Sequence, residues 1–393
     1  MSAQAPIIAG MEYGRRLLRR FALDPECTYL NHGAFGATPR VVLTAQERWR
    51  ARMERQPVRF MEETLPRALR RAAGELADYL GTSGERLAFV DNATTAVNTV
   101  LRSYPWKRGD ELILSDHAYP AVANAARYVA KRAGVAVREV TLPFPVRRAE
   151  DLVRPFLAAA GPRTRMAIVD HVCSKSALVM PLAAICAALR RRGVPVLADG
   201  AHAPGMLALE LDALGAHWYA GNCHKWLFAP KGCGFLWAAP EAAAGLTPLA
   251  ISNFHGAGFP AEFDWTGTRD PSAYLALSAA LAFHRSLGGP RLRTRNRRLA
   301  LAAARMLARA WDVELPAPAA LLGSMVSLAL PLPLRATAEA ALALNRRLWR
   351  EHRIEVPVFP LDGRLHLRIS AQAYNEPADY ELLAAAISAL ARR

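Results

Sequence analysis

Short apolar runs alternate with longer helical patterns between about residues 65 and 240, and this alternation restricts the possible fold more than any other feature. The runs that resemble buried strands are RLAFV (86–90), ELILS (111–115), RMAIVDHV (165–172), VPVLAD (194–199), AHWYAG (216–221) and GFLWA (234–238). The helical patterns include segments 94–104, 119–134 and 181–193. Strands that alternate with helices predict an α/β fold, with a mostly parallel sheet between layers of helices.

A second, smaller domain is expected after the linker SLGGPRLR (286–293). The run SMVSLAL (324–330) reads as a strand between two helices, and residues 354–370 read as two strands around a turn at LDG. A helix from about 377 to 392 would close a small α+β unit. Because 393 residues exceed one usual core, we expect two domains. The expected division is an N-terminal segment (1–28) packing with the small domain, a large domain (29–288) and a small C-terminal domain (289–393).

The formal net charge of +16 raises nucleic acid as a partner, but the distribution of the arginines argues against it. They are spread over many segments, and no aromatic residues interleave with the densest group, GPRLRTRNRR (289–298), to form a stacking platform. The longest uncharged run, residues 315–334, contains four prolines and favours a strand with loops over a membrane span. We therefore expect neither nucleic acid nor a membrane as partner.

The cysteines suggest neither disulfides nor a metal site. Their number is odd and none has C-x-x-C spacing; they are Cys27, Cys173, Cys186, Cys223 and Cys233. The first twenty residues also lack the apolar stretch of a signal peptide. These features predict a protein of the reducing cytoplasm.

Ligands of open α/β sheets bind at the carboxyl ends of the strands, so the residues directly after each apolar run are the candidates for a site. After RLAFV, the segment DNATTAVN (91–98) places Thr94 and Thr95 at a helix N-terminus, where they could bind phosphate or serve only as capping residues. After ELILS, either His117 or Tyr119 could lie flat on an aromatic ligand, although each could also simply pack or cap. After RMAIV, the polar stretch 170–181 offers Asp170, His171 and Ser174, or is only a loop.

Asp199 and Lys225 are the most informative residues in the remaining two segments. Asp199 ends a strand that should be buried on both faces, and a buried positive ligand atom explains a carboxylate there better than capping does. His202 follows three residues later. Lys225 is one of only five lysines in a chain with 50 Lys and Arg residues. If partly desolvated, its amine could act as a nucleophile or base; the alternative is an ordinary surface lysine.

Together these residues form the set that a phosphorylated pyridine aldehyde requires. The lysine would bond to the aldehyde, Asp199 would keep the ring nitrogen protonated, an aromatic residue would stack on the ring and the helix end would hold the phosphate. The protonated ring would act as an electron sink for a carbanion at the α-carbon of an amino acid.

At these motifs the sequence resembles the class V, fold-type I pyridoxal-phosphate (PLP) enzymes, and most of all their isopenicillin N epimerase-like branch. The resemblance covers nearly the whole chain, from YLNHGAFGATPR (29–40) to LRISAQAYN (367–375), and is most specific at DGAHAPG (199–205) and HKWLFAPKG (224–232). It implies an amino-acid substrate and a homodimer with active sites at the interface.

The resemblance also implies roles for individual residues. Lys225 would form the bond to the cofactor, Asp199 would pair with the ring nitrogen, and Arg368 would grip the substrate carboxylate. Asn31 and His32 would line the substrate entrance, and Thr268 would reach the phosphate of the other subunit. The implied cofactor contacts are Ala93, Thr94, Thr95, His117, Ser174, Asp199, His202, Asn222, His224, Lys225 and Thr268.

The reaction itself stays open at this point, because one lysine can serve epimerisation, elimination of a sulfur substituent and transamination. An epimerase would need a second acid, for which Tyr119, His117 or a water are candidates. Desulfurase activity is disfavoured, since the stretch 350–367 contains none of the cysteines. The sequence therefore favours an epimerase-like enzyme, with a C–S lyase of the hercynylcysteine sulfoxide lyase type or an aminotransferase as alternatives. A PLP-binding regulator without enzyme activity is disfavoured, because no helix-turn-helix extension is visible.

Overall fold

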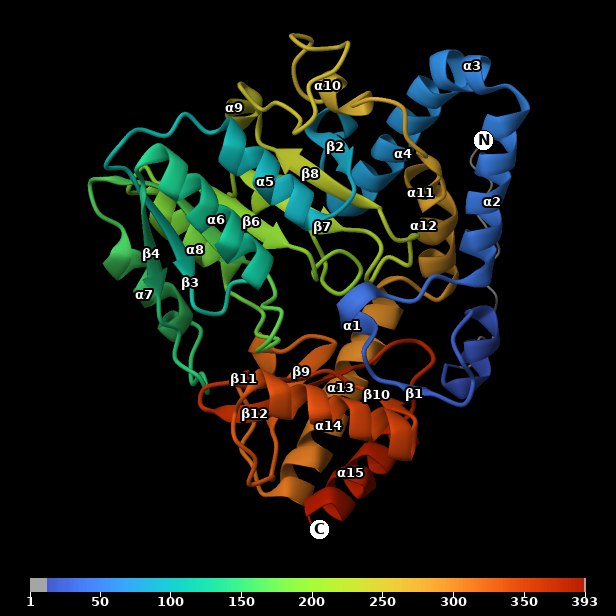
Figure 1. The fold of residues 1–393 in the computed structure, drawn as a ribbon, viewed down its shortest axis with the longest axis vertical. Coiled ribbons are helices and arrows are strands. Elements are labelled where there is room, and N and C mark those ends of the chain that lie inside the picture. Colours follow the sequence, from blue (N-terminus) through green and yellow to red (C-terminus); the bar gives the residue numbers. More distant parts are fainter. Residues whose placement is uncertain (1–12, 392–393) are drawn as a thin grey trace.

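The computed structural model describes residues 13–391. Its large sheet contains β2 (Leu87–Val90), β3 (Glu111–Ser115), β4 (Ala136–Val140), β5 (Thr164–Asp170), β6 (Val196–Gly200), β7 (Trp218–Asn222) and β8 (Gly234–Ala238). The spatial order is β2-β8-β7-β6-β5-β3-β4 (Figure 1). Only the pairs that involve β8 are antiparallel. The carboxyl ends of the other strands therefore face the same edge of the sheet.

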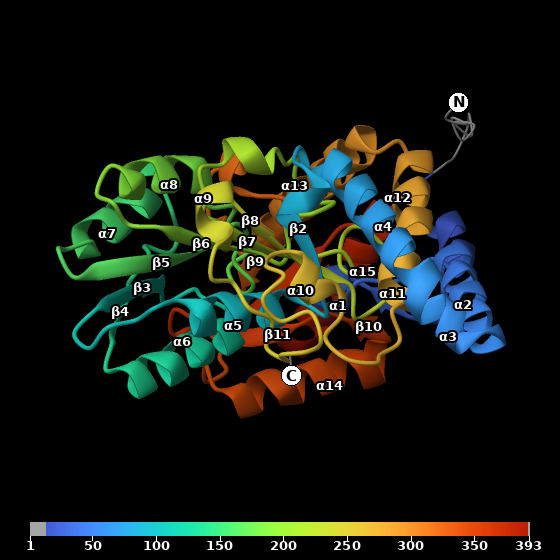
Figure 2. The ribbon, with the colours of Figure 1, turned by 90° about the horizontal axis from the view of Figure 1, so that it is seen from above.

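Helices cover both faces of this sheet. Figure 2 shows α5 (Ala93–Ser103) and α6 (Pro120–Ala133) on one side, and α7 (Glu150–Ala159) and α8 (Leu182–Arg190) on the other. The strands are buried on both faces apart from β4. The predicted α/β fold with a mostly parallel sheet is therefore confirmed.

Further helices pack beside and above the sheet. In chain order, they are α1 (His32–Phe35), α2 (Arg40–Arg55), α3 (Pro57–Arg59), α4 (Leu65–Leu80), α9 (Pro240–Ala243), α10 (Ala261–Asp264), α11 (Ser272–Leu275) and α12 (Leu277–Ser286). Helix α4 is a long amphipathic helix that ends at Gly81, which adopts the left-handed conformation usual for a helix C-terminus. None of the helices between residues 13 and 391 combines the length and apolar character that a bilayer crossing requires.

The C-terminal part forms a second sheet with its own helices. Strands β9 (Met325–Ala329), β11 (Val358–Leu361) and β12 (Arg364–Ser370) pair antiparallel in the order β11-β12-β9. Helices α13 (Pro290–Trp311), α14 (Ala338–His352) and α15 (Pro377–Ala391) surround this sheet (Figure 1). We place the domain boundary at Gly288 and Gly289, which have positive φ angles of 91° and 50° directly before α13.

The segment before residue 29 contacts this C-terminal unit. Strand β1 (Thr28–Tyr29) pairs in parallel with β10 (Ile354–Glu355), and the amide of Gly14 donates to the carbonyl of Ala373 at 2.8 Å. Residues 1–12 of the segment expected to pack with the small domain lie outside the described residues.

Two elements of the large domain differ from the sequence prediction. Strand β4 is not predicted, because it lies at the edge of the sheet and its residues AVREV are mostly exposed, so they form no apolar run. Strand β8 runs antiparallel to β7, because the connection between them, residues 223–233, contains no crossover helix and returns the chain directly.

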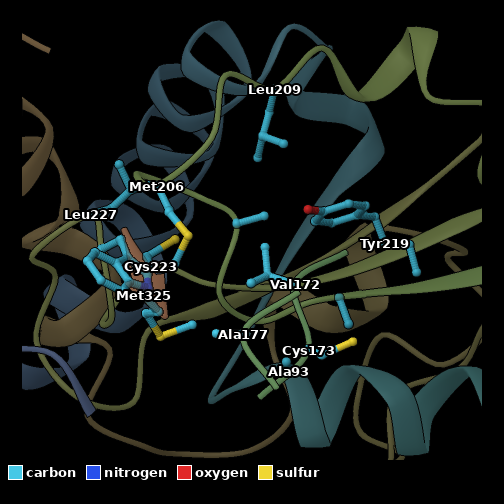
Figure 3. Close-up of a cluster of buried hydrophobic side chains, with 14 of the residues drawn as sticks. Ala93, Val172, Cys173, Ala177, Met206, Leu209, Tyr219, Cys223, Leu227 and Met325 are labelled. Atoms are coloured by element: carbon cyan, nitrogen blue, oxygen red, sulfur yellow. The ribbon is translucent and has the colours of Figure 1, made fainter. Parts of the chain in front are cut away.

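A cluster of buried apolar side chains includes residues from the loops that follow β2, β5, β6 and β7 (Figure 3). It includes Val172, Tyr219 and Cys223 of the large domain. Met325 of β9 lies beside Cys223 in the same cluster, close to Met206 (Figure 3). The core is thus continuous from one domain to the other at the place where the strand-end loops meet.

Candidate active site

A cavity of about 310 Å³ lies at the carboxyl edge of the large sheet. The loops that follow β2, β3, β5, β6 and β7 all contribute to its wall. The predicted site residues that line it are Ala93, Thr94, Tyr119, Ser174, Asp199, His202, Asn222, His224 and Lys225. Residues separated by more than a hundred positions are therefore gathered by the parallel arrangement of the strands.

Lys225 projects into this cavity from the turn between β7 and β8. Its Nζ lies 3.1 Å from Nε2 of His202. Burial, and to a lesser degree the positive charge of Arg368, lower the pKa of Lys225 to about 7, although Asp199 acts in the opposite direction. A large fraction of this amine is therefore unprotonated at neutral pH, as a nucleophile or base requires.

The backbone of Lys225 is held in place by helix α1. Nε2 of His32 lies 3.1 Å from the carbonyl oxygen of Lys225, and the hydroxyl of Tyr374 lies 2.8 Å from Nδ1 of the same ring. Gly36 ends this helix at a φ of 70°, and a Cβ there would lie 2.1 Å from the carbonyl oxygen of His224. Only glycine allows α1 to approach the lysine segment this closely.

The position of His32 differs from the sequence expectation. Its side chain is completely buried and lies outside the cavity wall, so it does not line a substrate entrance. Burial lowers the pKa of His32 to about 3, so the ring is neutral. Because its partners come from the lysine segment and from the C-terminal domain, His32 supports the catalytic turn from behind.

Asp199 is a buried carboxylate near the end of β6. Its Oδ1 accepts a hydrogen bond from the amide of Ala201 at 3.0 Å. Burial raises the pKa of Asp199, while that hydrogen bond and the charge of Lys225 lower it. A cation in the cavity would stabilise the ionised form, which matches the role expected opposite a protonated ring nitrogen.

His202 lies beside Lys225 as a neutral ring. Burial and the neighbouring positive charges of Lys225 and Arg368 hold its pKa well below the ordinary value. Its Nδ1 is buried and has no hydrogen-bond partner among the described residues. The ring can therefore exchange a hydrogen bond with the lysine amine without carrying a charge.

The N-terminus of α5 closes the cavity on the side of β2. Asn92 caps this helix, because its Oδ1 accepts from the amide of Thr95 at 3.0 Å. The amide of Ala93 donates to Oδ1 of Asn222 at 2.8 Å, which joins the helix end to the end of β7. Thr94 lies on the wall in the first turn, where helix amides have no partner within the helix. Thr95 belongs to the capping arrangement and does not line the cavity.

His224 completes this end of the cavity. Its Nδ1 lies 3.2 Å from the carbonyl oxygen of Cys233. Burial and the charge of Lys225 lower the pKa of His224 to about 4, so this ring is also neutral. With Thr94 and Asn222 it offers uncharged polar groups at a helix N-terminus, an environment that suits an anion such as phosphate.

The structure separates the two candidates for the aromatic wall. Tyr119 lines the cavity and is 44% exposed. His117 is buried outside the wall, where its Nδ1 lies 2.8 Å from the hydroxyl of Ser176 and its ring contacts Phe144 edge-on. Of the two candidates, Tyr119 is therefore the one that a ligand in this cavity would meet.

Arg368, on β12 of the C-terminal domain, is not among the residues that line the cavity but contacts Ser174, which does. It is buried, and one guanidinium nitrogen donates to the carbonyl oxygen of Ser174 on the cavity wall. Its Nε is buried without a partner among the described residues, and burial lowers its pKa to about 10. A buried cation with an unused donor can bind a carboxylate.

Two predicted residues lie away from the cavity. Asn31 is buried and donates from Nδ2 to Glu355 at 2.9 Å, so it joins the N-terminal segment to the C-terminal domain instead of lining an entrance. Thr268 is exposed on the loop between α10 and α11.

The sequence offered Asp170 in the polar stretch after the apolar run RMAIV, and the structure places it on the cavity wall as the last residue of β5. Among the wall residues that the sequence did not single out are Phe35, Asp91 and Lys231. Phe35 and Lys231 come from turns whose approach to the cavity depends on tertiary packing, so no local pattern marks them.

A doubly covered parallel sheet with a lysine, a buried carboxylate and a helix N-terminus at one edge defines the fold-type I class of enzymes. The Aminotransferase class-V family model matches residues 28–347, and this chain belongs to that family. Membership confirms the family resemblance seen in the sequence motifs.

Two curated relatives cover almost the whole chain. Isopenicillin N epimerase of Amycolatopsis lactamdurans is 38% identical over 392 residues, which cover 94% of this chain and 97% of the relative. The probable chloroplastic L-cysteine desulfhydrase of Arabidopsis thaliana is 33% identical over 398 residues, which cover 94% of this chain and 84% of the relative.

Solved structures share the fold. The cystine C–S lyase C-DES, in complex with its reaction product cysteine persulfide, has a TM-score of 0.76 and 25% identity, with 92% of this chain and 97% of that chain covered. A cysteine desulfurase from Thermococcus onnurineus has a TM-score of 0.81 at 18% identity, with 98% and 100% covered, and shows the fold alone.

Proposed function

We propose that this chain is a PLP-dependent enzyme that removes the α-proton of an amino acid, with Lys225 as its base. The observation that carries the proposal is an amine with a pKa of about 7 in a cavity that also contains a buried carboxylate, Asp199. The name of the family and those of its relatives point to the same chemistry.

The residues present fit pyridoxal 5'-phosphate. Asp199 is a buried carboxylate whose charge would be stabilised by a cation, and His202 has a buried Nδ1 without a partner. Thr94, Asn222 and His224 surround the N-terminus of α5, where a phosphate is favoured. When bound, the cofactor supplies an aldehyde that bonds to a primary amine and a ring that accepts electrons from the α-carbon.

Within this site, each side chain has a definite task. Lys225 would hold the cofactor through its aldehyde, and its Nζ would accept the α-proton of the substrate. His202 lies with its Nε2 3.1 Å from the lysine Nζ, and with Ser174 it would contact the ring hydroxyl. Asp199 would pair with the protonated ring nitrogen, and Tyr119 would lie against the ligand.

Arg368 binds the substrate carboxylate in this proposal. Its unused buried Nε and its position beside Ser174 direct a charged donor at the cavity wall. With its carboxylate bound by Arg368, the substrate would be held in a fixed position relative to Lys225. The α-hydrogen would then point at the amine that accepts it.

Epimerisation is the reaction we favour. Two isopenicillin N epimerases, at 36 and 38% identity, match the chain over 94% of its length. The reaction needs an acid on the face opposite Lys225, and we assign this role to Tyr119, whose side chain lines the cavity and is partly exposed.

Elimination of a sulfur substituent is the second candidate, because L-cysteine desulfhydrases and a C–S lyase are also similar to this chain. Desulfurase chemistry through a cysteine of this chain is not proposed. All five cysteines are buried, and none lines the cavity.

A homodimer is part of the proposal. Phe35 is 69% exposed at the rim of the cavity, and Leu249, Ile251 and Phe254 are exposed on the loop before α10. Large apolar side chains on the surface favour contact with another subunit. Thr268 lies further along the chain, and in this dimer it would contact the phosphate held by the partner subunit.

The test is incubation of the PLP-loaded protein with a panel of L-amino acids in deuterated water. Epimerisation gives a product with inverted configuration and deuterium at the α-carbon, whereas elimination from cysteine or cystine gives pyruvate and a reduced sulfur product. Transamination converts the cofactor to its aminated form once per site. Absence of α-deuterium exchange with every amino acid would contradict the proposal, and Lys225→Met is the matched inactive control.

A further inference from the structure

Asp170 lies beside Asp199 on the wall of the cavity. It is the last residue of β5 and is paired in parallel register with Asp199 of β6. Paired residues on neighbouring parallel strands project from the same face of a sheet, and both side chains line the cavity. His171 projects to the other face, where its Nδ1 lies 2.8 Å from the hydroxyl of Tyr219.

The two carboxyl groups have different surroundings. Each residue is 4% exposed. Asp199 accepts a hydrogen bond from the amide of Ala201 and faces the cation of Lys225. Among residues 13–391, the one hydrogen-bond donor given to the carboxyl of Asp170 is the amide of its own residue. Two carboxylates in such a place do not both ionise readily, so the one with fewer stabilising partners keeps a proton.

The other titratable and charged groups around the pair also favour a proton on Asp170 and a negative charge on Asp199. Burial and the charge of Asp199 raise the pKa of Asp170 well above its usual range. Cys173, packed beside Asp170, is buried and neutral. Among the cations near the cavity, Arg368 acts on Lys225, and both act on His202. Of the two carboxyls it is Asp199 that Lys225 stabilises, and Lys231 is a cause of the pKa of neither.

We propose that Asp170 is a positioning residue: a neutral carboxyl that holds the proton of the Asp170–Asp199 pair, so that Asp199 is the single carboxylate of the pair. The location of the proton is independent of the proposed function. Its purpose, one negative charge opposite one protonated ring nitrogen, rests on that function. A second buried carboxylate would add a desolvation cost without a second cation to offset it.

Infrared difference spectroscopy of the cofactor-free protein tests this proposal directly, because the C=O stretch of a protonated carboxyl absorbs apart from that of a carboxylate. We expect the wild-type protein at neutral pH to show a buried protonated carboxyl that disappears in Asp170→Asn and persists in Asp199→Asn. Loss of the band in Asp199→Asn but not in Asp170→Asn would overturn the proposal, as would absence of any such band in the wild type.

A second measurement does not depend on the folding of either variant. In the wild type, the protonated-carboxyl band should persist as the pH rises above the ordinary range for aspartate and then disappear. Loss of the band within the ordinary range would contradict the assignment.

Cofactor affinity separates a neutral positioning group from a charged one. Because asparagine replaces a neutral carboxyl, Asp170→Asn should bind PLP within roughly threefold of the wild type, while Asp199→Asn should bind at least about tenfold more weakly. Equal loss in both folded variants would show that Asp170 acts as a charge and would overturn the proposal. If the wild type binds no PLP, the proposed function fails while the infrared result still decides the proton's location.

Discussion

Replacing Arg368 by glutamine should raise the pKa of Lys225, and replacing Asp199 by asparagine should lower it. Burial is the largest cause of the depressed pKa, the charge of Arg368 adds to it, and the charge of Asp199 opposes it. The two substitutions therefore remove neighbouring charges of opposite sign around one amine. The pKa of Lys225 should therefore move in opposite directions in the two variants. A general loosening of the site would not produce opposite shifts.

The size of the effect follows from the fraction of free amine. A pKa of about 7 instead of the ordinary 10.5 means that the free amine at pH 7 is more abundant on the order of 10³-fold. Arg368 supplies the smaller part of this depression, so its removal should decrease the free amine at neutral pH by roughly three- to tenfold.

The assay is the rate at which the cofactor-free protein bonds covalently to added PLP, followed by visible absorbance from pH 6 to 10. The wild-type rate should level off above about pH 7, the pKa of Lys225. The pH at which the rate is half-maximal should lie higher in Arg368→Gln and lower in Asp199→Asn. Lys107→Ala removes an exposed lysine and should change nothing, and Lys225→Met should abolish the reaction. A wild-type midpoint near 10.5, or displacement of both variants in the same direction, would refute this reasoning.

Three further predictions concern the support of the lysine. Lys225→Met should stabilise the cofactor-free protein by up to a few kcal/mol below pH 7. The folded state disfavours the ammonium of Lys225, so the unfolded state binds more protons between about pH 7 and 10.5. The stability of the wild type should therefore rise with pH across that window. Denaturant titrations should show the stability advantage of Lys225→Met shrinking over the same range. Gly36→Ala should destabilise the protein by about 1–3 kcal/mol, because φ is 70° and a Cβ would meet the carbonyl of His224, whereas Gly109→Ala, with equally positive φ but open space, should lose only the backbone part. His32→Phe should slow cofactor attachment by removing the contact with the carbonyl of Lys225, and a rate equal to wild type would show that this contact does not position the amine.

The sequence identified those features of the site that depend on strand ends. Lys225 and Asp199 were predictable, because an isolated lysine and a carboxylate after a buried strand are unusual in any chain and the chemistry explains both. Helix α5 was predictable as well, because the polar segment 91–98 comes before a helical pattern, and in the structure Asn92 caps this helix.

The remaining features depend on contacts between distant segments. His32 belongs to a polar motif like those that contain the site residues. Its contacts, however, are with Lys225 and Tyr374, which lie 193 and 342 positions away. The choice between His117 and Tyr119 depends on where α6 begins relative to the cavity, because the two residues are only two positions apart and diverge at the helix start. The position of Asp170 beside Asp199 requires the strand register, which no local pattern contains.

Reduction of the PLP-loaded protein with borohydride, followed by peptide mass mapping, tests the proposed bond between Lys225 and the cofactor. Lys231 lines the same cavity and provides an internal comparison. We predict one phosphopyridoxyl group per chain, attached at Lys225. Attachment at Lys231, or at no residue, would rule out Lys225 as the lysine that holds the cofactor.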